Sequence, residues 1–335
     1  MNVSVLLAIE SSCDETSVAV CNNGKITANV IANQTIHQNY GGVIPELASR
    51  VHQQNIIPVL HEALKIAKVS KNELNAVAFT QGPGLLGALL VGVSFAKSLA
   101  LGLGLPLISV NHMHAHILAH FIDDPKPSFP FLCLTVSGGH TQIVLVNSHN
   151  DMRVVGETLD DAAGEAFDKT AKILNLPYPG GPLVDKHAKL GNPYAFKFGE
   201  PQIKDLDYSF SGLKTSILYF IRAQEKINAN FINDHLNDIC ASVQHSIVQI
   251  LMNKLKKAAI QYNIKEVAIA GGVSANSGLR NALQAQEAGL GWKTYIPAFV
   301  YCTDNAAMIA MAGYFKYLKK DFVGQDVAPT SRMAF

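Results

Sequence analysis

The sequence repeats one order of secondary structure, three strands followed by a helix, and this duplication constrains the fold more than any other feature. In the first half, apolar and alternating runs predict three strands and then a long helix, over Val3–Ile9, Thr16–Cys21, Lys25–Ala32 and Pro45–Lys68. In the second half the same order is predicted over Phe131–Val136, Thr141–Val146, Met152–Thr158 and Ala162–Leu174. Each unit has a polar or Gly-rich turn after its first strand. We therefore expect two similar α/β domains whose turns point into a shared cleft.

Two helical segments carry further expectations. Pro58 lies inside the first long helical pattern and predicts a kink there or a break into two helices. The stretch 85–105 is the most membrane-like in the chain, but Lys97 and four glycines interrupt it. This composition favours a helix buried on all sides of an α/β protein over a membrane span.

Composition excludes several classes of protein. Of the 335 residues, 48% are hydrophobic and 16% are charged, which is enough apolar material for a large core and excludes a disordered chain. The net charge of +1 excludes a strongly basic nucleic-acid binder, although it allows a local basic patch. The five cysteines have no CxxC spacing, which argues against a disulfide framework or a zinc ribbon. With no signal-peptide pattern over Met1–Glu10, we expect a cytoplasmic protein.

A cluster of histidines suggests a metal centre. His112 and His116 are four residues apart, so on a helix they share one face and can bind one metal ion. Asp304 lies at a predicted helix start and could add a carboxylate, giving a two-histidine, one-carboxylate site that favours iron(II) and tolerates zinc. The alternatives remain open at this point: the histidines could be polar surface, and Asp304 could be a simple helix cap.

Gly-rich turns form the second group of candidate residues. Ser137–Thr141 joins two predicted strands, and its glycines would let backbone N–H groups approach a phosphate. Gly271–Asn276 opens a helix after a strand, a place suited to a nucleoside or an anion. Tyr178–Pro182 predicts a rigid turn followed by Asp185, which could bond ribose hydroxyls. Any one of these turns could also be structural only. The Gly-rich stretch 81–87 lacks the Lys-Ser/Thr of a P-loop.

Taken together, the ordered motifs resemble the catalytic subunit of tRNA threonylcarbamoyladenosine synthase, a family formerly described as O-sialoglycoprotein endopeptidases. The resemblance covers almost the whole chain and its form looks bacterial. It rests on these segments: Ile9–Thr16, Pro45–Arg50, Gln81–Gly84, His112–His116, Val136–Thr141, Asp160–Lys169, Ser209–Lys214, Gly271–Asn276 and Cys302–Asn305.

This resemblance implies an α/β fold of duplicated actin/Hsp70/sugar-kinase-like (RNase H-like) domains that face a central cleft. The first domain is expected to comprise residues 1–117 with the C-terminal segment 304–335, and the second to comprise residues 118–303 with a helical insertion. The implied reaction transfers a threonylcarbamoyl group from threonylcarbamoyl-AMP to the exocyclic amine of an adenine in tRNA. That adenine lies 3′ of the anticodon in tRNAs that read codons beginning with A.

The resemblance also implies roles for individual residues. His112, His116 and Asp304 match the metal ligands, with iron(II) favoured and zinc possible. Asp14 and Glu15 match an acidic catalytic pair in the first loop. The positions that match the binding site of the intermediate are Thr135, Val136, Ser137, Gly138, Gly139, Asp168, Gly181, Asp185 and Asn276. His114-Ala115 departs from the Glu-Gly that many relatives carry between the ligands.

Implied partners are tRNA, an inactive actin-fold paralogous subunit and a small P-loop ATPase, with no membrane involved. Three other functions fit the sequence less well. A metalloprotease of the His-Glu-x-x-His type would need Glu at position 113, which is Met here. An actin-like ATPase would seldom bind its Mg²⁺ through two histidines. A non-enzymatic paralogue would lack the histidine pair. We also expect the segment 45–68 to contact the paralogous subunit, unless it is a fully buried core helix.

Overall fold

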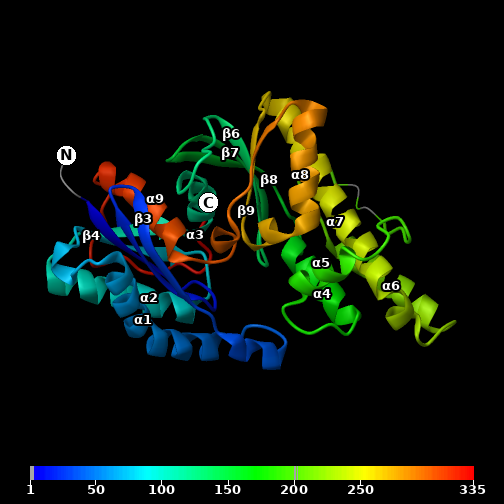
Figure 1. The fold of residues 1–335 in the computed structure, drawn as a ribbon, viewed down its shortest axis with the longest axis horizontal. Helices are drawn as coiled ribbons and strands as arrows, with labels where there is room; N and C mark the ends of the chain where they lie inside the picture. Colours follow the sequence, from blue (N-terminus) through cyan, green and yellow to red (C-terminus); the bar gives the residue numbers. More distant parts are fainter. Residues whose placement is uncertain (1–3, 200, 202) are drawn as a thin grey trace. The chain divides into compact units, whose positions relative to one another are not determined.

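The computed structural model describes residues 4–199, 201 and 203–335 and contains two five-stranded sheets (Figure 1). By the density of its contacts the chain divides into two compact units, which are described separately below. Unit 1 comprises Met1–Lys126 with Pro297–Phe335, and unit 2 comprises Pro127–Ile296. The first boundary falls inside a Pro-rich stretch. The expected domain boundaries at 117/118 and 303/304 stay a prediction.

The strands are β1 Val5–Glu10, β2 Thr16–Asn22, β3 Lys25–Ala32, β4 Ala76–Gly82, β5 Leu107–Asn111, β6 Phe131–Val136, β7 Thr141–Ser148, β8 Asp151–Glu157, β9 Glu266–Ala270 and β10 Lys293–Tyr295. The α-helices are α1 Pro45–Ala67, α2 Leu86–Leu103, α3 His112–Leu118, α4 Ala163–Ile173, α5 Gly180–Ala188, α6 Ser211–Glu225, α7 Phe231–Tyr262, α8 Ser277–Leu290 and α9 Ala306–Leu318. Val3, at the start of the first expected strand, lies outside the described residues.

The two sheets have the same topology. In unit 1 the strand order is β3-β2-β1-β4-β5, and in unit 2 it is β8-β7-β6-β9-β10, the corresponding order. In both, the first three strands pair antiparallel and the fourth pairs parallel with the first. This repeated topology confirms the expected duplicated α/β fold.

In unit 1, helices cover both faces of the sheet. Helices α1 and α2 pack on one face, and α9 crosses the other face, where it also contacts α3 (Figure 1). The central strands β1 and β4 are almost entirely buried, as apolar runs flanked by helices on both sides predict. Helix α9 comes from the C-terminal end of the chain, so this unit is built from two segments far apart in sequence.

In unit 2, the core gathers most of the remaining helices. Apolar side chains of β6, β7, α4 and the long helix α7 form one continuous cluster, which also includes the fully buried Phe210. Helix α7 contacts α5 and α8, so it connects the elements that carry the Gly-rich turns of this unit. The turns after β6 and β9 and the start of α5 are therefore held on one packed scaffold.

The structure corrects three expectations about helices. Helix α1 continues through Pro58, so the expected break into two helices is wrong, while the alternative of a kink stays a prediction. Helix α2 is not buried on all sides: only 33% of this 18-residue apolar segment is buried, and Leu86 and Leu90 are exposed. It is long and apolar enough to cross a membrane by length and composition, a property that core helices share. The residues predicted as a rigid turn at 178–182 instead start helix α5 at Gly180.

Candidate functional site

Helix α3 begins directly after β5 and carries both histidines of the predicted metal centre. The side-chain oxygen of Asn111 caps the helix by accepting hydrogen bonds from the backbone N–H groups of Met113 at 2.8 Å and His114 at 3.3 Å. His112 and His116 then lie one turn apart on the same face of the helix, and both are buried. The cap and the end of β5 thus fix where the pair points.

The start of helix α9 positions Asp304. Asn305 caps the helix by accepting from the Met308 N–H at 3.0 Å. Two side chains of the sheet bind the next free N–H groups: Ser17 of β2 accepts from Ala306 at 2.9 Å, and Asn29 of β3 accepts from Ala307 at 3.2 Å. The residue before the helix, Asp304, is therefore held against the sheet. Nothing in the sequence pattern marked Ser17 or Asn29 for this role.

The three predicted ligands come together in unit 1. The Nε2 atoms of His112 and His116 are 3.2 Å apart, and Asp304 Oδ1 lies 3.3 Å from the first and 3.2 Å from the second. These ligand atoms meet the geometry of a possible metal-binding group. A cation about 2.0–2.2 Å from each donor would leave neighbouring donors about 3–3.5 Å apart, so the spacing fits one divalent ion.

The charge around the three donors also favours a cation. Burial raises the pKa of Asp304, but His112 and His116 outweigh it and hold that pKa well below its ordinary value. Burial lowers the pKa of His112, yet Asp304 and Glu10 raise it well above its ordinary value. Burial dominates at His116, whose pKa is lowered. The carboxylates of Asp304 and Glu10 thus stabilise positive charge at this site, either a proton on His112 or a bound cation.

Glu10 supports the metal centre and was not predicted from the sequence. Its carboxylate is completely buried at the end of β1 and accepts from the Ser12 N–H at 2.5 Å and the Thr80 hydroxyl at 2.6 Å. It also lies 3.1 Å from Nδ1 of His112. Donation from Nδ1 to Glu10 leaves the lone pair of Nε2 facing the other two donors, the arrangement by which carboxylates orient metal-binding histidines. The signal in the sequence was an acidic residue ending a wholly apolar strand.

The predicted acidic pair, Asp14 and Glu15, lies in the loop between β1 and β2, and both residues are partly exposed. Burial, Asp304 and Asp14 raise the pKa of Glu15 well above its ordinary value. The negative charge of Asp304 therefore contributes to the raised pKa of Glu15. The two other histidines of the cluster, His114 and His120, are not in the group of convergent donors.

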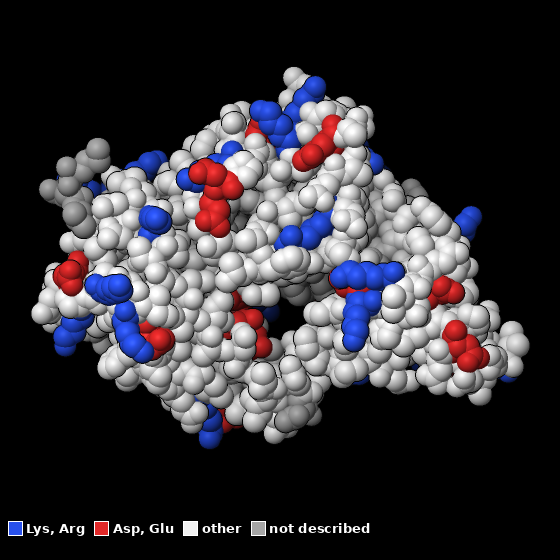
Figure 2. All heavy atoms as spheres, in the orientation of Figure 1, with Lys and Arg blue, Asp and Glu red and all other residues white. Residues whose placement is uncertain are grey.

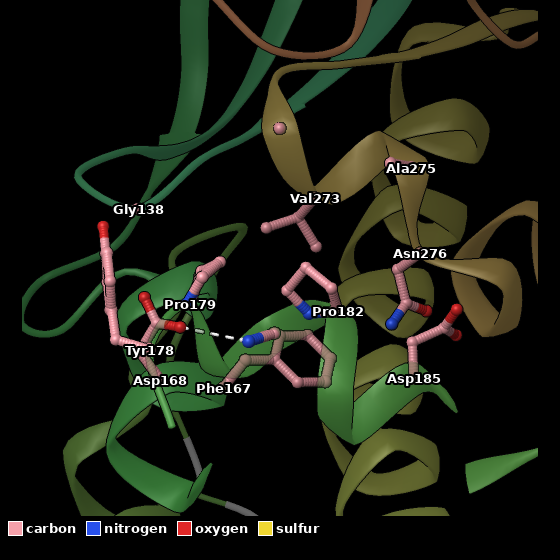
Figure 3. A pocket seen from close by; sticks show the side chains of 13 residues that line it. Gly138, Phe167, Asp168, Tyr178, Pro179, Pro182, Asp185, Val273, Ala275 and Asn276 are labelled. Carbon is pink, nitrogen blue, oxygen red and sulfur yellow. Dashed lines mark hydrogen bonds between the residues drawn. The ribbon is translucent and has the colours of Figure 1, made fainter. Parts of the chain in front are cut away.

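A pocket of about 360 Å³ lies in unit 2, within the range of sites that bind small ligands. Five of its lining residues belong to the predicted set: Gly138, Asp168, Gly181, Asp185 and Asn276. The wall also includes apolar side chains. In Figure 3, Phe167, Pro182 and Val273 occupy the middle of the view, with Asp168 toward one side and Asp185 and Asn276 toward the other.

The polar residues of this pocket are already hydrogen-bonded within the protein. Asp168 Oδ1 accepts from the N–H groups of Gly180 at 2.9 Å and Gly181 at 3.1 Å, at the start of α5. Burial nevertheless raises the pKa of Asp168. Asp185 Oδ1 accepts from the Ser277 N–H at 3.0 Å and hydroxyl at 2.6 Å. These bonds fix α5 against both α4 and the start of α8.

Asn276 is bonded on both sides of its amide. Its Oδ1 accepts from Leu279 N–H at 3.0 Å and its Nδ2 donates to Gln244 at 2.7 Å. The other four predicted binding residues do not line the pocket in this structure. Thr135 and Val136 are fully buried in β6, while Ser137 and Gly139 lie in the turn beside Gly138. Phe167 and Val273 lie within two of the motif segments, Asp160–Lys169 and Gly271–Asn276, but sequence reasoning gave them no binding role.

Basic side chains do not form a continuous field on the face seen in Figure 2, where Lys and Arg are scattered among uncharged atoms. Several are engaged in ion pairs: Lys169 binds Asp161 at 2.6 Å and Glu165 at 2.8 Å, and Lys189 binds Asp185 at 3.1 Å. The visible distribution agrees with the near-neutral net charge.

Solved structures with related folds support the architecture. The fold is similar to component A of (R)-2-hydroxyglutaryl-CoA dehydratase from Acidaminococcus fermentans, with a TM-score of 0.54 at 17% identity, covering 95% of this chain and 100% of that chain. It is also similar to HypF from T. kodakarensis, with a TM-score of 0.61 at 15% identity, covering 97% of this chain and 49% of that chain. At these identities the similarity concerns the fold alone: duplicated, actin-like α/β units.

Sequence comparisons identify the family. Proteins named tRNA N6-adenosine threonylcarbamoyltransferase are 60% identical in Christiangramia forsetii over 98% of both chains, and 61% identical in Cytophaga hutchinsonii over 98% of this chain and 96% of that one. A more distant relative of the same name, from Thermosipho africanus, is 48% identical over 94% of this chain and 95% of its own. The family profile described as tRNA N6-adenosine threonylcarbamoyltransferase matches residues 25–311. The chain therefore belongs to the tRNA N6-adenosine threonylcarbamoyltransferase family, as its motifs predicted.

Proposed function

We propose that this chain transfers a threonylcarbamoyl group from threonylcarbamoyl-AMP to the exocyclic amine of the adenine 3′ of the anticodon, in tRNAs that read codons beginning with A. Family membership supports the transfer to tRNA adenosine. The observation that carries the proposal is the intact group of three convergent donors, His112, His116 and Asp304, in a chain of this family. Its place of action is the bacterial cytoplasm.

The proposed chemistry suits an activated acyl donor. The exocyclic amine of adenine is a weak nucleophile, because its lone pair is delocalised into the ring. In the transfer, a C–N bond forms at the carbamoyl carbon, the C–O bond to phosphate breaks, AMP leaves, and the amine loses a proton. Asp14 and Glu15 are the proposed groups that accept this proton, since carboxylates in the first loop of unit 1 can act as bases. The adenine must be unstacked from the anticodon loop to react.

We assign the metal centre to His112, His116 and Asp304, with Glu10 orienting His112. Two imidazoles and one carboxylate favour iron(II), and zinc is a plausible substitute. A divalent ion in such a site polarises and orients acyl or phosphoryl oxygens. The residues of the chain hold the ion in a fixed place, because both ligand-bearing segments begin at capped helix ends.

We assign the AMP portion of the donor to the pocket of unit 2. The turn Ser137–Gly139 is suited to approach a phosphate through its backbone N–H groups, and Thr135 and Val136 hold that turn at the end of β6. Asp168, Gly181, Asp185 and Asn276 supply polar groups for ribose or base. Phe167 and Val273 offer apolar surface against which a purine can pack.

The proposed partner of the α1–α2 face is the inactive actin-fold paralogue, and a small P-loop ATPase completes the assembly. Ile57 is 53% exposed, Leu86 is 52% exposed and Leu90 is 46% exposed, and a groove there is lined by both helices. Exposed apolar surface of this kind is typical of protein interfaces. Ile57→Glu or Leu90→Glu should abolish co-purification with the paralogue, whereas Ile260→Glu, an exposed residue of unit 2, should not. Unchanged co-purification in both variants would contradict this interface.

A reconstituted assay tests the function. The chain is purified anaerobically, its metal content is measured, and it is combined with the paralogue, the ATPase, threonylcarbamoyl-AMP and unmodified tRNA. Mass spectrometry of the tRNA nucleosides should show threonylcarbamoyladenosine with the wild type and with His61→Ala, which changes an exposed histidine. The Asp304→Asn variant should form little or no threonylcarbamoyladenosine. A fully active Asp304→Asn variant, or a metal-loaded wild type without product, would contradict the proposal.

A further inference from the structure

The last segment of the chain, residues 323–335, runs along the surface of unit 1 beside the elements of the metal centre. We call this segment the C-terminal strap. It begins where Val323 N–H donates to Leu107 O at 2.9 Å, at the start of β5. Further along, Lys97 of α2 donates to Val327 O at 3.0 Å. The strap is mostly exposed, so hydrogen bonds hold it in place rather than a core of its own.

The strap is bonded to the turn that follows β4. Thr330 N–H donates to Gln81 O at 2.9 Å, and Gly84 N–H donates to Ser331 O at 3.2 Å. The approach is close enough that a Cβ at Gly82 would overlap the carbonyl oxygen of Thr330. Glycine is therefore required at position 82 for the strap to lie where it does.

This turn is connected to His112 through contacts with Ser12. Leu85 N–H donates to Ser12 O at 2.7 Å, and a Cβ at Gly84 would collide with Ser12. The hydroxyl of Ser12 is 3.3 Å from Nδ1 of His112, and its N–H donates to Glu10. The strap is thus connected, through one turn and one serine, to the side of His112 that faces away from the predicted metal.

A second connection reaches helix α3 itself. Asn111, whose side-chain oxygen caps the helix, donates from Nδ2 to the carbonyl oxygen of Ala334 at 2.9 Å. One residue later, the ring of Phe335 packs edge-on against His114, with ring centroids 4.5 Å apart. His114 lies between the two metal ligands, on the face of α3 that the strap covers.

We propose that the C-terminal strap positions helix α3, and through it His112 and His116, for metal binding. Phe335, Asn111 and Gly82 are the positioning residues, and His114 is the receiving surface on the helix. This inference deepens the proposed function, since it rests on the metal centre assigned above. The strap acts on the geometry of the two histidines and contributes no ligand itself.

Five variants of the full chain, including two controls, separate this role from simple stability. Phe335→Ala removes the ring against His114, and Phe335→Tyr retains it. Asn111→Ser keeps a side-chain oxygen to cap α3 but is too short to reach Ala334. Gly82→Ala forces the strap away from the turn. Arg332→Ala, which changes an exposed side chain of the strap, is the matched control.

The measurements are cobalt(II) binding, followed by its d–d absorption spectrum and by chelator competition, and hydrogen exchange of the amides of α3. Residues that support metal ligands typically change affinity by about 10–100-fold. We expect Phe335→Ala, Asn111→Ser and Gly82→Ala to weaken cobalt binding by about tenfold, alter the spectrum and speed exchange in α3. Phe335→Tyr and Arg332→Ala should match the wild type.

The results distinguish the strap from the metal centre. If the wild type binds cobalt and all three disruptive variants bind it equally well, with unchanged exchange in α3, the role of the strap is wrong while the metal centre stands. If the wild type binds no cobalt, both the centre and the positioning role are wrong. If Arg332→Ala weakens binding as much as Phe335→Ala, the specific contacts described here do not carry the effect.

Discussion

The metal centre of unit 1 and the pocket of unit 2 are built in opposite ways. In unit 1, the donor atoms of His112, His116 and Asp304 converge at 3.2–3.3 Å and contact one another. In unit 2, the polar atoms of Asp168, Asp185 and Asn276 already have hydrogen-bond partners within the protein. The first site can bind one ion between donors that already converge, whereas the second must exchange or share hydrogen bonds that connect separate helices.

This difference indicates how each site is expected to respond to mutation. A site of convergent donors depends steeply on each ligand and on the groups that orient it, because every donor contributes charge and geometry. A pocket whose walls are bonded to each other depends on shape and on the room left for the ligand. The predictions below test that contrast, from the largest expected effect to the smallest.

The largest effect is expected for a metal ligand. Asp304→Ala or His116→Ala should lower the affinity for iron(II) or zinc by more than about 100-fold, because removing one of three donors leaves an incomplete site. Metal content after purification and chelator competition measure this, with circular dichroism to show that the chain stays folded. Full metal occupancy in either variant would rule out the assignment.

Substitution of Glu10 should have the second-largest effect on metal affinity, smaller than the effect of replacing a ligand. Glu10→Gln keeps the shape of the side chain but removes the negative charge behind His112. We expect a loss of metal affinity of about 10–100-fold. The comparison variant is Glu62→Gln, an exposed acidic residue of α1. If Glu10→Gln binds metal as tightly as Glu62→Gln does, His112 does not depend on Glu10 for its orientation.

In unit 2, the prediction concerns the room that the turn after β6 leaves for a ligand. Nothing lies within 4 Å of a Cβ built at Gly139, so Gly139→Leu should fold normally. Its side chain would occupy room at the turn, and affinity for AMP should fall about tenfold, or about 1.4 kcal/mol. In contrast, a Cβ at Gly164 would collide with the Ser137 carbonyl, so Gly164→Ala should lower the melting temperature. Calorimetry of both variants separates binding from folding, and unchanged AMP affinity in Gly139→Leu would remove the turn from the site.

The smallest effect concerns a carboxylate outside both sites. Burial raises the pKa of Asp160, but hydrogen bonds from the Ser209 hydroxyl and the Phe210 and Ser211 N–H groups outweigh it and lower the pKa. A lowered folded-state pKa stabilises the fold above the unfolded value of about 3.9 and loses this contribution as the pH falls through the folded value.

Accordingly, Asp160→Asn should be less stable than the wild type at pH 7, and the difference should shrink under acid conditions. Urea unfolding at a series of pH values measures it, with the exposed Asp326→Asn as a control. A difference that grows as the pH falls would have the wrong sign for a lowered pKa.

Much of the fold was predictable because periodicity is local. The first three strands of each unit and the shared order of elements follow from apolar patterns and turn residues, whereas the short strand β10 was not predicted. Helix α5 was missed because Pro179 and two glycines suggested a turn, although Gly180 begins a helix whose first N–H groups Asp168 binds. The exposed face of α2 was missed because the hydrophobicity of a segment does not show which of its side chains other elements cover.

The residues of the candidate site were predictable only where the residue type and its spacing indicate a chemical role. The spacing of His112 and His116 and the acidic residue at 304 suggested the ligands, and the resemblance supplied the polar residues of the pocket. Glu10, Ser17 and Asn29 were not predicted, because their roles depend on long-range pairing of strands and helix ends. The strap was missed for the same reason: residues 323–335 have no helical or strand pattern, and their partners lie about two hundred positions earlier.

The position of Asp304 along the chain has a consequence for biosynthesis. The histidines are made early, but the third donor and the helix behind it follow only after all of unit 2 has been translated. During synthesis the first part of the chain emerges with a histidine pair and Glu10 but without its closing carboxylate. The ion-binding group can therefore be completed only near the end of translation, when α9 takes its place against Ser17 and Asn29.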